Sequence, residues 1–154
     1  MAATYTVVRS RTIPAPVERV FPLIVDFHQW TRWSPWEDVD PELHRDYSGP
    51  EAGTGAVYAW SGNRKAGAGR MEIVRTEENR LVDIALDFQK PFKASNQTTF
   101  TLEPTGDSTL VRWQMVGPRP LFMRLFGFLF NVEKRVGGDF EKGLQRMALT
   151  ARPS

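Results

Sequence analysis

The sequence predicts an α+β fold in which a curved antiparallel sheet wraps around one long C-terminal helix. The helix is indicated by a helical period: from Leu121 to about Leu149 apolar side chains recur every 3.6 residues, in phase across Asn131. The sheet is indicated by a period of two, which six short runs follow between residues 43 and 116. A helix this long needs a broad apolar surface to pack on, and the predicted sheet supplies it.

The start of the chain predicts a strand followed by two short helices. β-Branched residues mark Thr4–Thr12 as a strand. Pro16 suits the first position of a helix, and Pro22 inside the apolar pattern that follows predicts that this helix is short and kinked. Asp26 is expected to cap a second short helix that ends near Trp30.

The middle of the chain predicts a loop and then consecutive antiparallel hairpins. Residues 31–42 are rich in tryptophan and are expected to form the loop. In the run that begins at Leu81, apolar residues alternate with Asp83 and Asp87, so one face of the sheet should be apolar and the other solvated. Turn clusters separate the six expected strands, which are His44–Tyr47, Gly55–Trp60, Gly69–Thr76, Leu81–Phe88, Ala94–Leu102 and Thr109–Val116.

Composition bounds the class of protein. A chain of 154 residues is expected to form one domain over residues 1–154, and 41% hydrophobic with 25% charged residues is ordinary for a globular protein. Without cysteine there is no disulfide and no thiolate site. The net charge is +2, and the Lys and Arg residues are spread along the chain without a basic cluster, which argues against a nucleic-acid partner. No segment reaches the ~18 apolar residues of a membrane span and no signal peptide is evident, so we expect a cytoplasmic protein without a transmembrane segment.

Several motifs in a fixed order carry a family resemblance. They are APVERVF, then W..W.PW, GTGAVYAWSGN, GAGRMEI, FTLEP.G..T.VRWQM.G and GGDFEKGLQRM. In this order and spacing the chain resembles the polyketide cyclase/dehydrase branch of the START-like (SRPBCC) superfamily, which includes the major birch pollen allergen and has the helix-grip fold. The resemblance covers nearly the whole chain, and it implies a cavity between the concave sheet face and the long helix.

Strand parity and helix phase predict which side chains would line that cavity. An aromatic and aliphatic wall suits a small hydrophobic ligand, although aromatic residues at strand spacing are more often plain core. Ile73 is expected to face inward as well, with Trp33 or Trp36 near the mouth. The predicted apolar contacts are Tyr58, Trp60, Met71, Ile84, Leu86, Phe88, Phe100, Trp113 and Met115 from the strands, and Leu129, Phe140 and Leu144 from the helix.

Polar groups on the inward face are few. Asn96 and Thr98 share the parity of Phe100 and are expected to face inward, where they would orient a hydroxyl or carbonyl of the ligand. The alternative is that both satisfy backbone groups or bind a buried water. The acidic run, composed of Glu37, Asp38, Asp40 and Glu42, is expected to be a solvated loop.

The sequence leaves three functions open. The first is a binding module for a small hydrophobic or aromatic ligand, lipid-, polyketide- or quinone-like. The second is a polyketide cyclase or aromatase that uses the same cavity; its catalytic residues are unknown, because neither His28 nor His44 has a relay pattern. No cluster has metal-ligand spacing, so no metal and no cofactor are expected. The scarcity of inward ionisable residues favours binding over catalysis.

The third function is a protein-partner or membrane-docking module whose docking surface is the densest apolar run of the chain, Leu121–Phe130. Leu121, Met123, Phe128 and Phe130 extend beyond the core-facing stripe of the predicted helix. Such a run is buried, paired or in contact with lipid. We expect either that the tryptophan-rich residues 31–36 cover it, or that it forms a lid, a homodimer contact or a weak membrane contact beside the cavity mouth.

Overall fold

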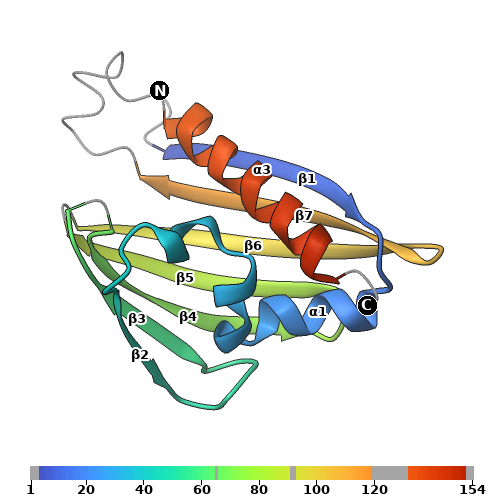
Figure 1. Cartoon of the computed structure of the whole chain (residues 1–154), viewed down its shortest axis with the longest axis horizontal. Coiled ribbons are helices and arrows are strands. Elements are labelled where there is room, and N and C mark those ends of the chain that lie inside the picture. Colours follow the sequence, from blue (N-terminus) through green and yellow to red (C-terminus); the bar gives the residue numbers. More distant parts are fainter. Residues whose placement is uncertain (1–3, 65, 91–92, 119–131, 152–154) are drawn as a thin grey trace.

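One seven-stranded antiparallel sheet carries the helices of the described residues on its concave face (Figure 1). The computed structural model describes residues 4–118, except 65, 91 and 92, and residues 132–151. The strand order is β1-β7-β6-β5-β4-β3-β2, so the first strand pairs with the last. The strands are β1 (Thr4–Ile13), β2 (His44–Ser48), β3 (Val57–Ser61), β4 (Ala68–Glu77), β5 (Leu81–Lys90), β6 (Ala94–Thr105) and β7 (Ser108–Pro118). This is the predicted α+β fold.

Up to residue 32 the helices that follow β1 are those that the sequence predicts, and after residue 32 the structure differs from the prediction. Helix α1 (Val17–Val25) contains Pro22, and the 3-10 helix η1 (Phe27–Arg32) is capped by Asp26, which accepts a hydrogen bond of 2.9 Å from the backbone N–H of His28. Residues 31–42, predicted as a loop, contain a second 3-10 helix, η2 (Pro35–Asp38). The fixed φ of Pro35 suits the first position of a helical turn, which favours this local structure.

Helix α3 (Val132–Ala151) lies across the concave face, with its closest packing against β1. Phe140, Leu144 and Met147, at helical spacing, are almost completely buried against the sheet. The helix was predicted to begin near Leu121; the part up to residue 131 lies outside the described residues, and so does Leu121–Phe130 as a docking surface. No helix in the described part of the chain is long and apolar enough to cross a bilayer.

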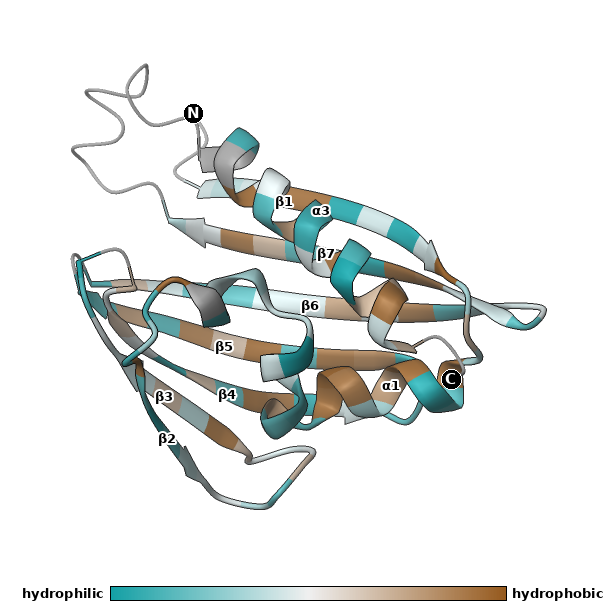
Figure 2. Ribbon diagram, in the orientation of Figure 1, coloured by the Kyte–Doolittle hydropathy of each residue, from teal (hydrophilic) through white to brown (hydrophobic). Residues whose placement is uncertain are grey.

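Hydrophobic and hydrophilic residues alternate along strands of the sheet, as predicted (Figure 2). Along β4, β6 and β7 buried residues alternate with more exposed ones. The inward set includes Ile73, Phe100 and Trp113, and the outward set includes the ion pair between Arg70 and Glu72. The inward side chains therefore form the floor on which α3 and the short helices pack.

Candidate functional site

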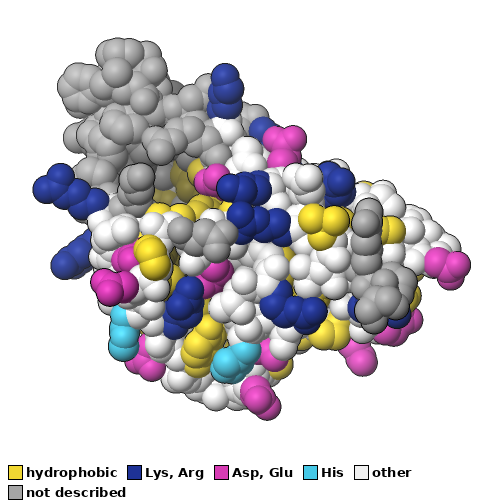
Figure 3. Space-filling view, viewed as in Figure 1, with side chains coloured by type: hydrophobic (Ala, Val, Ile, Leu, Met, Phe, Trp, Pro, Cys, Tyr) yellow, Lys and Arg dark blue, Asp and Glu magenta, His cyan; other side chains and the backbone are white. Residues whose placement is uncertain are grey.

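A cavity of about 220 Å³ lies between the concave face of the sheet and the segment around η2. Most of its wall is aromatic or aliphatic, with Ser34, Glu37 and the Tyr58 hydroxyl as the polar exceptions. Apolar side chains reach the surface between α3 and the β2–β3 edge of the sheet (Figure 3). The lining residues are Trp30, Ser34, Trp36, Glu37, Val39, Leu43, Tyr58, Trp60, Ala66, Met71, Leu86, Phe88, Met115 and Val136.

The floor of the cavity consists of side chains that stand opposite one another on neighbouring strands. Tyr58, Met71 and Leu86 form one such row across β3, β4 and β5. In the next row Trp60 lies over Gly69, where an added Cβ would come within 2.5 Å of the indole ring. Glycine at this position therefore leaves the space that the Trp60 ring occupies.

The wall opposite the floor is attached to α3. The indole N–H of Trp36 donates to Asp139 Oδ2 at 3.2 Å, and Arg146 donates to the backbone carbonyl of Ser34 at 3.3 Å. Gly143 allows this close approach, because a Cβ there would lie only 3.0 Å from Trp113 and 3.1 Å from Pro35. The helix thus fixes the position of η2 over the sheet.

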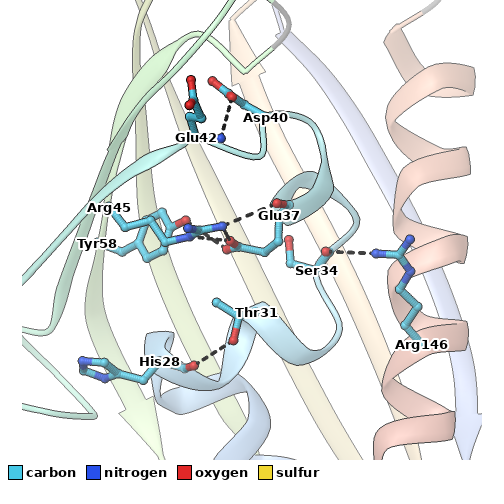
Figure 4. A network of polar contacts seen from close by, with 9 residues as sticks. All are labelled: His28, Thr31, Ser34, Glu37, Asp40, Glu42, Arg45, Tyr58 and Arg146. Atoms are coloured by element: carbon cyan, nitrogen blue, oxygen red, sulfur yellow. Dashed lines mark hydrogen bonds and ion pairs between the residues drawn. The ribbon is translucent and has the colours of Figure 1, made fainter.

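A buried carboxylate with two hydrogen-bond donors forms the polar wall of the cavity (Figure 4). Glu37 accepts from Arg45 Nε at 2.7 Å and from the Tyr58 hydroxyl at 2.9 Å, and Arg45 Nη2 lies 2.6 Å from the same carboxylate. The Glu37 side chain is only 8% exposed. The prediction of a solvated acidic loop is wrong here, because the β2–β3 hairpin brings a guanidinium and a phenol to the η2 carboxylate and compensates its desolvation.

Tyr58 stays a hydrogen-bond donor over the whole neutral range. Burial raises the pKa of its phenol far above the usual value, and the negative charge of Glu37 raises it further. The hydroxyl therefore presents a proton to Glu37 and does not compete with it for one.

Asp40 is also buried, and its carboxylate stabilises the loop by accepting hydrogen bonds from backbone N–H groups. It accepts hydrogen bonds from the backbone N–H of Glu42 at 2.9 Å and of Asn63 at 2.8 Å, which ties the β3–β4 turn to the segment after η2. Its predicted exposure is wrong for this reason. Within the described ranges no three His, Asp or Glu side chains are placed to hold a metal ion.

The structure brings together part of the predicted ligand-binding set. Tyr58, Trp60, Met71, Leu86, Phe88 and Met115 line the cavity. Ile84, Phe100, Trp113, Phe140 and Leu144 are at most 1% exposed and belong to the core around the cavity and not to its lining. Leu129 lies outside the described residues.

Stacking accounts for the position of Trp113 and Phe140. Their rings are parallel with centroids 4.0 Å apart, and Trp36 packs edge-on against both. Trp36, 38% exposed, thus stands at the cavity, whereas Trp33 is fully buried and donates its indole N–H to the carbonyl of Leu23. Of the two tryptophans predicted for the mouth, Trp36 is the one that lies there.

The sequence did not single out the wall residues from η1, η2 and the turns. Trp30, Ser34, Glu37, Val39, Leu43 and Ala66 stand in segments without a regular period, so no face could be assigned to them. Pro35 following Ser34 was the one local signal that a helical turn starts there.

A second, more open groove of about 250 Å³ lies on the other side of Tyr47 and Phe27. His28 stacks on Tyr47 with ring centroids 4.2 Å apart, and its Nδ1 lies 2.8 Å from Asp26. Tyr47 and Phe27 both contact Tyr58, so these aromatic rings separate the groove from the cavity.

Comparisons with known proteins agree on the fold. Solved structures with the same fold include protein CV1439 of Chromobacterium violaceum, at 15% identity over 97% of this chain and 98% of that one, with a TM-score of 0.70. CalU16 of Micromonospora echinospora has 20% identity over 98% and 78% of the two chains and a TM-score of 0.65. Norcoclaurine synthase of Thalictrum flavum, in complex with dopamine and hydroxybenzaldehyde, has 10% identity over 98% and 89% and a TM-score of 0.68.

At these identities the structures establish the fold alone, and no curated protein matches the sequence. The family is established by the sequence: residues 4–152 match the family described as polyketide cyclase/dehydrase and lipid transport. The chain belongs to this polyketide cyclase/dehydrase and lipid transport family, within the START-like (SRPBCC) group that the sequence motifs indicated.

Proposed function

We propose that the protein binds a small aromatic or otherwise apolar molecule in the cavity between the sheet and η2. The observation that supports this most strongly is the apolar wall of Trp30, Trp36, Trp60, Phe88 and Met71 around a space of about 220 Å³. Apolar side chains that could have filled this space instead surround it, which is typical of a ligand pocket and not of a close-packed core.

The volume limits the size of the ligand. An apolar cavity of about 150 Å³ holds a benzene molecule, so about 220 Å³ suits a molecule with one or two rings. The ligands in the norcoclaurine synthase structure, dopamine and hydroxybenzaldehyde, are single-ring aromatics. Among the ligand types considered from the sequence, small ring compounds therefore fit better than long lipid chains.

The polar wall adds a preference for ligands with a hydroxyl or amine. Glu37 lines the cavity as an acceptor, with Arg45 balancing its charge. A ligand hydroxyl that reached it would find a charge-assisted hydrogen bond in an apolar surrounding, where such bonds are strong.

Calorimetric titration with 2-naphthol tests the proposal. Wild-type protein is expected to bind it saturably, and Leu86→Trp, which fills the floor of the cavity, is expected to abolish the heat of binding. Val74→Trp adds the same ring to the exposed outer face of the sheet and is expected to leave binding unchanged. Equal binding by both variants would mean that the ligand sits elsewhere.

A polyketide cyclase-type activity is the second candidate, and the position of Glu37 in the cavity favours it. In such a reaction Glu37 would accept a proton from a carbon next to a carbonyl. The resulting enolate carbon would bond to a second carbonyl carbon of the same chain, and the new alkoxide would take the proton back. Arg45 and Tyr58 already hold the carboxylate, so one of them would have to move first, and binding ranks ahead of catalysis for this reason.

Cyclisation of heptane-2,6-dione to 3-methylcyclohex-2-enone with loss of water tests this activity. An active enzyme would form the enone faster than buffer does, and Glu37→Gln would remove the excess rate. A wild-type rate equal to that in buffer would contradict an aldol activity on small diketones and leave the binding function as it stands.

A further inference from the structure

The row of side chains on the cavity floor does not end at Leu86. Asn96 on β6 stands directly opposite Leu86, and Gly117 on β7 stands on the other side of Asn96, opposite Tyr5 of β1. A Cβ on Gly117 would overlap the Asn96 amide, so the missing side chain makes room for it. With about 4.8 Å between strands, the three steps from Tyr58 to Asn96 span roughly 14 Å.

The neighbouring row brings a second polar side chain to the same border. Thr98 on β6 stands between Ile84 on β5 and Met115 on β7. Leu86 and Met115 line the cavity. Asn96 and Thr98 are their neighbours on β6 and lie one step beyond the lining residues. Side chains two apart on a strand share a face, so both polar groups point toward the space between the sheet and α3.

Both side chains carry a buried atom without a hydrogen-bond partner. Asn96 is 7% exposed and Thr98 is 4% exposed, and within the described part of the chain neither Asn96 Nδ2 nor Thr98 Oγ1 finds a partner. Most buried polar atoms in folded proteins are paired, so two adjacent exceptions require an explanation. The third unpaired atom, Trp113 Nε1, belongs to the stacked core cluster.

The orientation of the Asn96 amide follows from Tyr5. The Tyr5 hydroxyl donates to Asn96 Oδ1 at 2.7 Å, and burial raises the pKa of this phenol, so it keeps its proton. The amide oxygen is thereby occupied, and the NH2 group, which can only donate, points away from Tyr5.

We infer that Asn96 Nδ2 and Thr98 Oγ1 form the recognition end of the cavity for a carbonyl oxygen. This rests on the proposed ligand-binding function and names the ligand class: a one- or two-ring aromatic ketone, aldehyde or quinone. A carbonyl oxygen has two lone pairs and accepts from both donors at once, while the rings lie along Leu86, Met71 and Phe88. The Glu37 wall, at the Tyr58 end of the row, then takes a hydroxyl on the far side of the same ligand.

A pair of probes of nearly equal shape tests the assignment. 2-Acetylnaphthalene carries the carbonyl, and 2-isopropenylnaphthalene replaces its oxygen with a CH2 group. Wild-type protein is expected to bind the ketone roughly tenfold more tightly, the effect of one or two hydrogen bonds to otherwise unpaired donors. Thr98→Val removes the hydroxyl at constant shape, and Asn96→Asp removes the NH2 donor while keeping the acceptor for Tyr5.

Both variants are expected to lower the affinity for the ketone several-fold and to leave the affinity for the hydrocarbon unchanged. Thr101→Val, on the exposed face of the same strand, is the matched control and is expected to change neither. If wild type and Thr98→Val bind both probes equally, the inference is wrong although the cavity still binds rings. If wild type binds neither probe, the proposed function itself fails and the inference fails with it.

Discussion

The Tyr58 hydroxyl donates a hydrogen bond of 2.9 Å to Glu37, and this bond joins the cavity floor on β3 to the wall on η2. Arg45 from β2 contacts the same carboxylate and completes a three-residue bridge between the hairpin and the 3-10 helix. The bridge holds the hairpin side of η2, while α3 holds its other side through Trp36 and Ser34. Measuring how much this bridge contributes to the free energy of unfolding therefore tests the structure of the site.

Replacing the carboxylate tests that strength. Glu37→Gln keeps the side-chain shape but leaves the partly buried Arg45 guanidinium without its counter-charge, so we expect the free energy of unfolding to fall by about 1–3 kcal/mol in urea titrations. Glu72→Gln, in the exposed pair with Arg70, should change it by less than about 0.5 kcal/mol. Equal effects of the two substitutions would show that the Glu37 bridge contributes no more than a surface pair.

Alkaline pH provides a second test of the same bond. The pKa of Tyr58 is raised in the folded protein, by burial first and by Glu37 second, so above the ordinary pKa of 10.0 the unfolded chain loses a proton that the folded chain keeps. Stability contributed by this phenol is present below pH 10 and is lost as the pH rises beyond it. We expect Tyr58→Phe to show a shallower fall in unfolding free energy between pH 9 and 11 than wild type, and an identical slope would contradict this.

Two buried threonines on neighbouring strands, Thr98 and Thr109, differ in whether their hydroxyl group has a hydrogen-bond partner. Thr109 Oγ1 donates to the Ala15 carbonyl at 2.8 Å, whereas Thr98 Oγ1 has no partner within the described residues. Thr109→Val should lower the free energy of unfolding by about 1–2 kcal/mol, because it leaves a buried carbonyl unpaired. Thr98→Val should leave it unchanged or raise it. A loss at Thr98 equal to that at Thr109 would mean that its hydroxyl is already satisfied in the unliganded protein.

Two glycines in α3 differ in the space around them. A Cβ at Gly138 would meet nothing within 4 Å, so Gly138→Ala should raise the free energy of unfolding by about 1 kcal/mol through helix propensity. At Gly143 the Cβ would press on Trp113 and Pro35, and we expect Gly143→Ala to lower stability. Thermal melts of the two variants check both, and stabilisation by Gly143→Ala would show that α3 does not hold η2 closely.

Sequence periodicity predicted most of the fold because the burial of each regular element is one-sided. Alternation placed Met71, Leu86 and Phe88 on the inward face, and they line the cavity. Periodicity could not separate Trp33 from Trp36, since a short 3-10 helix has no sustained stripe. It could not find Glu37 either, because burial of a carboxylate depends on Arg45 and Tyr58, which the hairpin brings to it.

Strand parity predicts which side chains face inward, but it cannot tell which of these line the cavity and which belong to the core. Phe100 and Trp113 have the same inward parity as Thr98 and Met115, yet Phe140 and Trp36 pack against Trp113 and close the space above it. Which inward positions border a cavity depends on what α3 and η2 place over them.

Methionine methyl NMR during titration with 2-naphthol tests the central claim most directly. Met71 and Met115 line the cavity, and Met147, fully buried in α3, is an internal control in the same protein. The account predicts that the Met71 and Met115 methyl signals shift and saturate together, that Met147 does not follow them, and that Leu86→Trp abolishes the shifts. Signals of Met71 and Met115 that stay in place while the compound binds, or no saturable shift in any of the three, would contradict it.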